Sequence, residues 1–547
     1  MRGRTAQADP ADRTERTEHT GRGDRGDGAG QGGGRRGHRR GAGRPRRRRR
    51  RVLGWIAGTL VVLLIGTAGA GYLYYRHLNG NIKKGERSSA ETGVTKRKPN
   101  AAGQTPLNIL LIGSDSRSSA ENVKLGGSKD NAGNPPLGDV QLLIHLSADR
   151  KSAAFVSIPR DTRVAIPQCT EPETGKVFPA TNAIINESLA RGGAGCTLAT
   201  WEKLTGVYID HWMTIDFAGV VDMADAVGGV DVCVKQNVWD RPTAAVSGGS
   251  GLKMKAGTHS VKGKQALQWL RTRHAWGSDQ MRARAQHMYL NSMIRKLKDQ
   301  NVFTDAGRLR NLAETATDSL TVSKEIGTVK KLYDMAMELK SVPTDRVTMA
   351  TMPNIEDPQD RNHVLPDGAD AEQMWQMLRD DVPFDKNGKP EKDDKNGDAS
   401  PSPTPTPSSS PDRIGVTVVN GTGSDTQAAV PGRAETIAQE LADKGYTRAV
   451  KDTSPAAAEA RTVVRYPSAE LKGDAVQVAK SLGIPVSSVR RSTDASGVTV
   501  VVGADWRSGT AYPKKAAPSP GSLPENSDAI NGSDKDQCMD VYAPYRW

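Results

Sequence analysis

Apolar runs separated by polar turns divide this 547-residue chain into segments of different character. Residues 52–75 carry no charged side chain, and about 20 such residues suffice to cross the hydrocarbon core of a bilayer. From 105 to 384 and from 412 to 506, short apolar runs alternate with helical patterns. The pattern predicts one transmembrane helix, acting as a signal-anchor, followed by two folded domains.

The composition shifts abruptly between these segments, most clearly at the run PSPTPTPSSSP, which reads as an extended linker. The predicted division is a tail (1–51), a transmembrane helix (52–75), a stalk (76–104), a large domain (105–384), a Pro/Ser/Thr linker (385–411), a small domain (412–506) and an irregular tail (507–547).

In the large domain, three apolar runs at 107–113, 140–146 and 152–158 predict buried strands. A tight polar turn at 147–151 joins the last two, so they should form an antiparallel hairpin. Further helices are expected near 182–191, 197–205, 218–227, 280–299, 304–318, 324–340 and 370–380, with strands near 208–216, 229–234 and 347–352. This mixture predicts an α/β fold, with a central mixed β-sheet flanked by helices and a small C-terminal α/β domain.

Positive charge is concentrated at the N-terminus. Residues 1–51 hold 17 arginines against six carboxylates, which is +11 of the formal net charge of +14. The positive-inside rule keeps such a segment cytoplasmic, so the remainder should lie outside the cell membrane in a single-pass arrangement. The tail is expected to be disordered and to contact anionic lipid, and no nucleic-acid partner is expected.

Four cysteines follow the apolar helix, and an even number outside the membrane permits disulfides. Cys169 and Cys196 bracket a polar insertion and are the favoured pair. Cys233 lies in an apolar run and could be a buried thiol, so its pairing with Cys538 stays open. The cysteine and histidine spacing does not suggest a structural zinc site.

The hairpin brings two charged residues together. Reflection through the turn makes Asp139 and Arg160 cross-strand neighbours at one sheet edge, and Asp115 follows its own strand. Strand ends are where α/β sheets hold ligands. The structural alternatives are a turn or helix-capping role for Asp115, and a simple ion pair of Arg160 with Asp139 or Asp161.

A second candidate lies in RTRHAWGSDQMRARAQ, residues 271–286, where four arginines surround Asp279. Arg282 and Gln286 share a helix face, whereas Arg284 should face solvent. The alternatives are a solvated helix face and a helix N-cap at Asp279. Arginines grip phosphoryl oxygens and carboxylates hold magnesium, so the two candidates together suggest a metal–diphosphate site.

Several ordered motifs resemble the LytR-CpsA-Psr family of cell-envelope proteins, clearly over about residues 105–300. They read NILLIGSDSR (108–117), FVSIPRDTRV (155–164), WEKLTGVYIDHWMTIDFAGV (201–220), DAVGGVDVCV (225–234) and KQALQWLRTRH (264–274). Residues 413–506 are similar to the accessory domain of some members, and the linker and composition are similar to those of high-GC actinobacterial members.

The resemblance implies a cell-envelope phosphotransferase that moves a glycopolymer, such as teichoic acid, from a polyprenyl-pyrophosphate carrier to the muramic acid 6-hydroxyl of peptidoglycan, with pyrophosphatase as a side activity. It implies Mg²⁺ or Mn²⁺ as cofactor. Matching positions make Asp115, Asp139, Arg160 and Arg273 catalytic, Asp115, Asp139 and Asp279 metal-linked, and Arg117, Arg160, Arg271, Arg273, Arg282 and Gln286 diphosphate-binding. The polyprenyl chain would lie in an apolar tunnel between sheet and helices.

One departure separates the chain from the family pattern. Members usually read Arg-Ser-Asp-Thr around the hairpin aspartate, whereas this chain has Leu137, Gly138, Asp139 and Val140. A phosphate-binding arginine is thus absent at Leu137, and Arg117 is the candidate substitute. This departure leaves open a non-catalytic protein that binds polyprenyl pyrophosphate or the cell wall. A second alternative, which the historical naming of the family suggests, is a membrane-bound transcriptional attenuator that acts through the cytoplasmic tail.

Overall fold

A computed structural model of the chain describes residues 46–116, 119–126, 134–244, 246–299, 305–388, 409–423, 427–454, 458–459, 461–492, 495–513 and 518–547. The chain divides into two compact units, residues 1–70 and residues 71–547. The predicted disorder covers the tail at 1–51. Residues 1–45 lie outside the described part, whereas residues 46–51 form the first turns of a helix, so the prediction is wrong for them.

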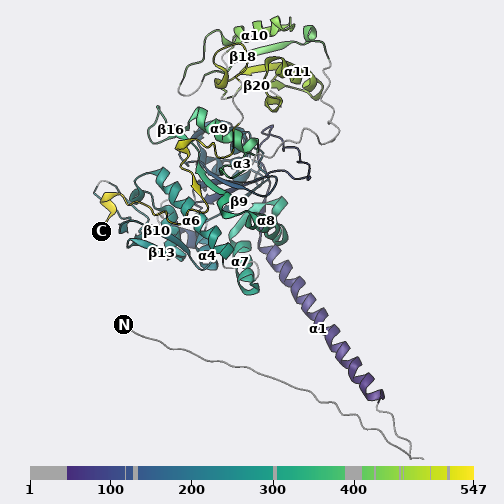
Figure 1. The fold of residues 1–547 in the computed structure, drawn as a ribbon, viewed down its shortest axis with the longest axis vertical. Coiled ribbons are helices and arrows are strands. Elements are labelled where there is room, and N and C mark those ends of the chain that lie inside the picture. The colour runs from purple at the N-terminus through teal and green to yellow at the C-terminus, as the bar shows by residue number, and fades with distance from the viewer. Residues whose placement is uncertain are drawn as a thin grey trace, which may run out of the picture. The chain divides into compact units, whose positions relative to one another are not determined.

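The predicted transmembrane segment is helical. Helix α1 spans Arg46–Asn81, and its part from Arg51 to Asn81 is long and apolar enough to cross a membrane (Figure 1). Its last residues belong to the second unit, where Leu78 and the following Ile82 are buried.

An eight-stranded mixed sheet forms the centre of the large domain, in the order β1-β14-β9-β2-β3-β4-β15-β23. Its strands are β1 (Lys83–Gly85), β2 (Leu107–Ser114), β3 (Gly138–Leu146), β4 (Ala153–Ser157), β9 (His211–Ile215), β14 (Leu320–Ser323), β15 (Val347–Thr351) and β23 (Ile530–Asn531). The predicted hairpin is confirmed, because β3 and β4 pair antiparallel with Leu142 opposite Ser157.

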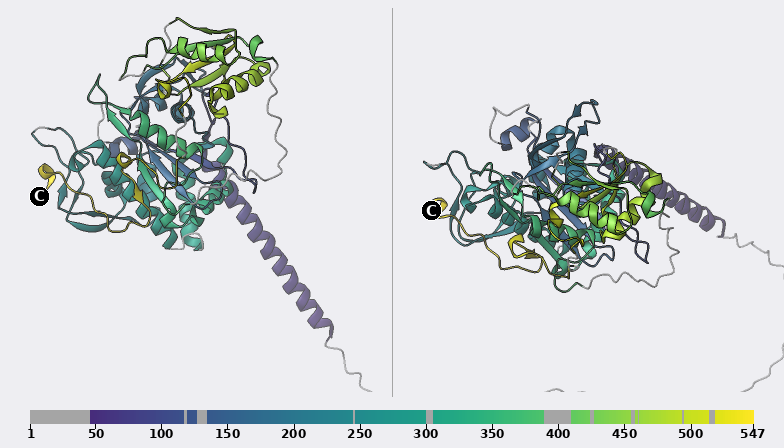
Figure 2. Two further views of the ribbon diagram at one scale, coloured as in Figure 1. Left: turned by 45° about the horizontal axis from the view of Figure 1, so that its top comes forward. Right: turned by 90° about the horizontal axis from the view of Figure 1, so that it is seen from above.

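Helices cover both faces of this sheet (Figure 2). On one face, Leu110 and Val156 pack with α3 and α9, and on the other Ile109 and Phe155 pack against α6 and α8. The helices are α2 (Ala120–Gly126), α3 (Gly193–Thr205), α4 (Phe217–Ala226), α5 (Gly263–Arg271), α6 (Asp279–Asp299), α7 (Ala306–Ser319), α8 (Val329–Ser341) and α9 (Gly368–Arg379). The alternation of side chains along β2 and β4 therefore fills two separate cores, which confirms the predicted fold class.

One sequence prediction for this domain is wrong. Residues 181–184 form a strand, β8, before a 3-10 helix at Ile185–Arg191, because β8 pairs with β5. The strand predicted at 229–234 is confirmed as β10, at 230–234, and it pairs with β13 in a separate sheet. The two-stranded sheets are β5 (Arg163–Ile166) with β8 (Thr181–Ile184), β6 (Cys169–Thr170) with β7 (Val177–Phe178), β10 (Val230–Val234) with β13 (Gly257–Val261), β11 (Val238–Trp239) with β12 (Lys253–Met254), and β16 (Asn354–Glu356) with β17 (Val364–Pro366).

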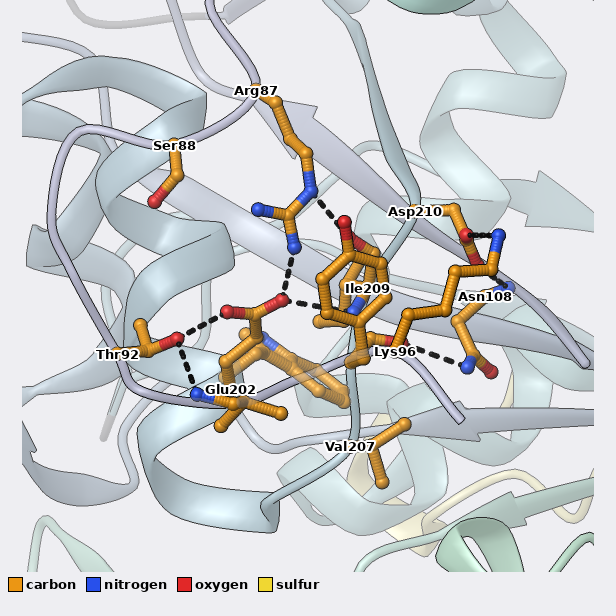
Figure 3. Close-up of polar contacts among 12 residues, drawn as sticks. Arg87, Ser88, Thr92, Lys96, Asn108, Glu202, Val207, Ile209 and Asp210 are labelled. Atoms are coloured by element: carbon orange, nitrogen blue, oxygen red, sulfur yellow. Dashed lines mark hydrogen bonds and ion pairs between the residues drawn. The ribbon is translucent and has the colours of Figure 1, made fainter. Parts of the chain in front are cut away.

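Both edge strands of the central sheet come from segments that the sequence classed as stalk and irregular tail. Strand β1 pairs with β14, and β23 pairs with β15. The rest of the stalk is also docked by side chains, as Figure 3 shows: Arg87 and Thr92 donate to the buried carboxylate of Glu202, and Lys96 to Asp210. The stalk is thus an integral part of the domain, and the two additions cover edges that would otherwise expose unpaired backbone groups.

The small domain is an α/β module, as predicted, and its sheet has five strands. Its sheet has the order β19-β18-β22-β20-β21 and carries α10 and α11 on a core that includes Ile437 and Val478. The elements are β18 (Val416–Asn420), α10 (Arg433–Asp443), β19 (Ala449–Lys451), β20 (Val463–Tyr466), α11 (Lys472–Leu482), β21 (Val489–Arg491) and β22 (Val498–Val502).

All four cysteines are paired. The predicted Cys169–Cys196 disulfide is confirmed, with the Cα atoms 5.7 Å apart. Cys233 is not a buried thiol, because it bonds to Cys538 across 305 positions of sequence.

Candidate active site

A cavity of about 290 Å³ lies where β2 and β9 end and β3 begins. Gly113, Ser114, Asp139, Val140 and Ile215 reach it from these strands, Arg160 follows β4, and Asp216 and Phe217 lie at the start of α4. The opposite wall is formed by Leu267, Leu270, Arg271, Arg273, His274, Arg282 and Gln286, with Asp240, Gly249 and Ser250 from the β11–β12 connection. The two stretches that the sequence singled out, the hairpin ends and residues 271–286, therefore meet at one cavity.

The pair of Asp139 and Arg160 forms the sheet side of this cavity. Because β3 and β4 keep their register, Arg160 Nη1 donates to Asp139 Oδ1 over 2.9 Å, and Arg160 Nε lies 3.5 Å from Asp161 Oδ1. Burial alone would lower the pKa of Arg160, but the neighbouring carboxylates, Asp139 foremost, outweigh burial and raise the pKa. Its guanidinium is therefore firmly charged.

Asp279 links two arginines on the helix side. Arg282 Nη2 donates to Asp279 Oδ2 over 2.9 Å, and Arg273 Nε lies 3.4 Å from Asp279 Oδ1. Burial lowers the pKa of Arg282 although Asp279 opposes it, and the nearby charge of Arg160 lowers it further. The cations of the two sides are thus close enough to repel, which favours an anion between them.

Asp279 is not the N-cap of α6, since Ser278 Oγ accepts the backbone N–H of Met281. Arg282 and Gln286 both line the cavity from one helix face, as predicted. Arg284 is paired instead of facing solvent alone, because it donates to Asp528 and Gln537 near the C-terminus.

Arg271 and Gln286 are held at the cavity by backbone oxygens. Arg271 Nη1 donates to the carbonyl of Leu125 over 2.7 Å, and its guanidinium lies 4.8 Å from the centre of the Phe217 ring. Gln286 Nε2 donates to the carbonyl of Leu270 over 2.9 Å, which ties α6 to the end of α5.

Asp115 lies one residue beyond the cavity-lining Ser114. Its Oδ1 accepts the backbone N–H of Leu137 over 2.6 Å, and its own N–H donates to the carbonyl of Leu137. Leu137, where the resemblance expects an arginine, is thus fixed beside the predicted catalytic carboxylate of Asp115. The candidate substitute, Arg117, falls outside the described residues.

Sequence reasoning missed several polar residues of the cavity, among them Asp240 and His274. Asp240 is buried after β11, with Oδ2 accepting the N–H of Ser250. Neither belonged to a recognisable pattern, because each reaches the cavity from a connection between short elements.

Three buried polar atoms around the cavity have no hydrogen-bond partner among the described residues: Arg160 Nε, Asp240 Oδ1 and Asp279 Oδ1. Buried polar atoms are normally paired, and each exception calls for an explanation. A polar ligand in the cavity would supply the missing partners.

The fit of a divalent cation depends on the ligand. Within the described part of the chain, no group of three or more His, Cys, Asp or Glu side chains is placed to hold a metal alone. Magnesium, however, commonly takes one or two carboxylates and completes its shell with substrate phosphates and water. Asp139 lines the cavity, and Asp279, whose Oδ1 accepts no hydrogen bond from the described residues, is ion-paired with the lining arginines Arg273 and Arg282. These carboxylates would suit a magnesium ion that arrives with a diphosphate.

Comparisons with known proteins give a consistent assignment. The sequence model of the LytR_cpsA_psr family matches residues 72–380, and that described as LytR cell envelope-related transcriptional attenuator matches residues 413–506.

Two relatives have names that state a role in the cell wall. The cell wall biosynthesis protein LcpA of Corynebacterium glutamicum is 28% identical over 321 residues, covering 53% of this chain and 58% of LcpA. The polyisoprenyl-teichoic acid–peptidoglycan teichoic acid transferase TagT of Bacillus subtilis is 26% identical over 304 residues, covering 55% of this chain and 87% of TagT. The chain thus spans little more than half the length of LcpA.

Among solved structures, the LytR-Csp2A-Psr enzyme from Actinomyces oris aligns with a TM-score of 0.40 and 16% identity, over 55% of this chain and 96% of that one.

Proposed function

The chain belongs to the LytR_cpsA_psr family, and we propose that it is a phosphotransferase that moves a glycopolymer from a polyprenyl-pyrophosphate carrier to the muramic acid 6-hydroxyl of peptidoglycan. The observation that carries this proposal is the cavity itself. Four arginines converge there on a space of about 290 Å³ in which buried polar atoms are left unpaired. Guanidinium groups arranged in this way suit the oxygens of a diphosphate.

The apolar part of the lining suits the carrier. Val140, Ile215, Val220, Leu267 and Leu270 face the cavity beside the arginines. The first isoprene units would lie against these side chains while the diphosphate meets the charged wall. The role of TagT, as its name states it, is a transfer from a polyisoprenyl carrier to peptidoglycan, which supports this reading.

The reaction would be a phosphoryl-type displacement. The acceptor hydroxyl oxygen forms a bond to the phosphorus that bears the glycopolymer, and the bond from that phosphorus to the bridging oxygen breaks. The polymer is then joined to peptidoglycan through a phosphodiester, polyprenyl phosphate leaves, and the hydroxyl proton passes to a carboxylate, for which Asp139 is placed at the cavity wall.

The arginines lower the barrier because they face the phosphoryl oxygens where negative charge is held during transfer. Arg160 would act from the sheet side and Arg273 and Arg282 from the helix side. Mg²⁺, held by Asp115, Asp139 or Asp279, would neutralise charge on the diphosphate when bound.

The function requires a location at the cell membrane, and we propose that the chain is a single-pass membrane protein. With residues 1–51 on the cytoplasmic side, the cavity would lie outside the cell, where peptidoglycan is found. Lipid contact of the arginine-rich tail belongs to the same proposal.

Reconstituted transfer with the full chain tests the function. Purified wild-type protein in lipid vesicles should join a polyprenyl-pyrophosphate-linked glycan to peptidoglycan fragments, and mass spectrometry should detect the new muramic acid phosphodiester. Arg160→Ala should abolish the product, whereas Arg308→Ala, which changes an exposed arginine of α7, should not. Product from Arg160→Ala at the wild-type rate would contradict the assignment.

Leu137 favours one second function, a carrier-binding protein without turnover. The backbone N–H of Leu137 donates to Asp115, and Leu137 brings an uncharged side chain to the position where related sequences are expected to have an arginine. Wild-type protein that binds the carrier but yields no phosphodiester, together with a Leu137→Arg variant that does, would establish this alternative.

A further inference from the structure

The last residues of the chain run along the large domain and are far from irregular. We call residues 518–547 the C-terminal strap; Figures 1 and 2 show it in yellow beside the helices and strands of the large domain. Near its start, the N–H of Gly521 donates to the carbonyl of Pro383. Farther along, the strap adds β23 to the central sheet. It ends with Trp547 Nε1 donating to the carbonyl of Val238.

A covalent bond fastens the strap near the cavity. Cys538 is joined to Cys233 on β10, and the next residue, Met539, exchanges backbone hydrogen bonds with Cys233 and Lys235. We call residues 271–286 the arginine segment. Met539, Val541 and Tyr545 are buried in the same core as Trp269, which precedes this segment, and Trp276, which lies within it. The strap therefore shares a core with the helix side of the cavity.

The strap also contacts the arginine segment directly. The N–H of Tyr542 donates to the carbonyl of Ala275 over 2.8 Å, and the ring of Tyr545 stacks on His274 with centroids 6.3 Å apart. His274 lines the cavity, and Arg273 immediately precedes it. Farther along α6, Arg284 donates to the strap residues Asp528 and Gln537.

Within the large domain, the segment between α5 and α6 is held by the hydrogen bond between the hydroxyls of Thr272 and Ser250 and by burial of the Trp276 ring against Trp269. The contacts of the strap add to these at a short 3-10 turn, His274–Trp276, which is followed by Gly277 at a φ of 89°. The Arg273 side chain is 45% exposed, and within the described part of the chain its one ion pair is with Asp279. Its direction into the cavity thus depends on where the backbone of the turn lies, and that backbone is held from outside by the strap.

We infer that the strap is a positioning element of the active site: the Tyr542 N–H and the Tyr545 ring set the turn that aims Arg273 at the diphosphate, and the Cys233–Cys538 bond keeps them there. This inference rests on the proposed function for the identity of the ligand. It assigns Tyr542 and Tyr545 as positioning residues, which need not touch the substrate.

A single hydrogen bond can be removed without changing the rest of the strap. Tyr542 has a φ of −61°, the value that a proline ring imposes, and its side chain is 55% exposed. Tyr542→Pro therefore deletes the N–H that Ala275 accepts, while the matched control Tyr542→Ala keeps it. Both variants lose the same exposed ring.

Farnesyl pyrophosphate serves as the binding probe for the full-length chain in detergent. Tyr542→Pro should bind it about three- to ten-fold more weakly, the range expected for loss of one hydrogen bond, whereas Tyr542→Ala should bind as wild type does. Tyr542→Pro should unfold at a slightly lower temperature, because the carbonyl of Ala275 loses its partner, and both variants should be fully folded at the temperature of the titration. Equal binding by the two variants, whether wild-type or weakened, would overturn the inference.

A second readout separates this inference from the proposed function. Wild-type protein that binds no farnesyl pyrophosphate contradicts the proposed function, and hydrogen exchange then decides the inference alone. Amides 273–277 should exchange faster in Tyr542→Pro than in Tyr542→Ala. Equal exchange in the two variants would show that the strap does not set the turn.

Discussion

The two sides of the cavity are held in place by different means. On the sheet side, Asp139 lies near the start of β3 and Arg160 follows the end of β4. These two strands pair in the eight-stranded sheet, and their pairing brings the two side chains into contact. On the helix side, Arg273 and Arg282 extend from a short turn and a helix that are tied to the distant C-terminal strap. One side is defined by local register, and the other by a segment more than 240 residues away.

This difference predicts how two of the cavity's arginines rank in ligand binding. An arginine that is already aimed and desolvated loses little freedom when it binds, whereas an exposed one must be ordered first. The Arg160 side chain is 24% exposed, against 45% for Arg273. Arg160 should thus supply more of the affinity than Arg273.

The largest expected effect follows from this. Arg160→Ala should weaken farnesyl pyrophosphate binding about 100-fold and Arg273→Ala about ten-fold, within the range for hydrogen bonds to charged groups. Isothermal titration with the full-length chain measures both. A larger loss of affinity in Arg273→Ala than in Arg160→Ala would reverse the ranking of the two arginines.

The two disulfides offer a sharper contrast. Breaking either by paired Cys→Ser substitution should reduce the free energy of unfolding by about 2–4 kcal/mol. Only the Cys233→Ser/Cys538→Ser pair should also weaken farnesyl pyrophosphate binding, because Cys169 and Cys196 lie in the core that contains α3 and not in the core that Met539 and Tyr545 share with the helix side.

Chemical denaturation and the same titration give the two quantities for each pair. Unchanged binding in Cys233→Ser/Cys538→Ser would show that the helix side holds its geometry without the strap.

The helix side should also be sensitive to acid. Burial, aided by the charge of Arg284, lowers the pKa of His287 on α6 from 6.5 to about 4. Between these values the unfolded chain binds a proton at this position and the folded chain does not, so stability falls as the pH decreases from 6.5 to 4. The loss due to this group approaches about 3 kcal/mol.

Urea denaturation at several pH values tests this. His287→Gln should show a shallower decrease in stability over the same range, whatever its absolute stability. An unchanged slope would mean that His287 does not contribute to the acid sensitivity.

The smallest expected effect is a gain in affinity for farnesyl pyrophosphate. Leu137→Arg would add a cation beside Asp115 on the sheet side, and binding of farnesyl pyrophosphate should tighten a few-fold, about 1 kcal/mol. A leucine-sized neutral control, Leu137→Met, should leave binding unchanged. Weaker binding by Leu137→Arg would show that this position does not face the ligand.

The two sides also differ in how far the sequence predicted them. The Asp139–Arg160 contact followed from counting residues about a short turn, because strand register is a local property. The convergence of Arg282 and Gln286 followed from helix periodicity. Both depend on spacing that is visible within about 25 residues.

The contribution of the strap could not be predicted in this way. Tyr542, Tyr545 and Cys538 act through contacts with residues hundreds of positions away, and β23 and β1 are too short to show periodicity. The same reason explains why Cys233 was left open and why Arg284 was expected at the surface: the partners that bury them are supplied only by the folded chain.

The most direct test of the central claim is native mass spectrometry of the full-length chain extracted from its membrane in mild detergent. A diphosphate site for a lipid-linked polymer predicts a bound polyprenyl-pyrophosphate species in the wild-type protein and its loss in Arg160→Ala. Wild-type protein without any such species, or equal amounts of it in both proteins, would contradict the account.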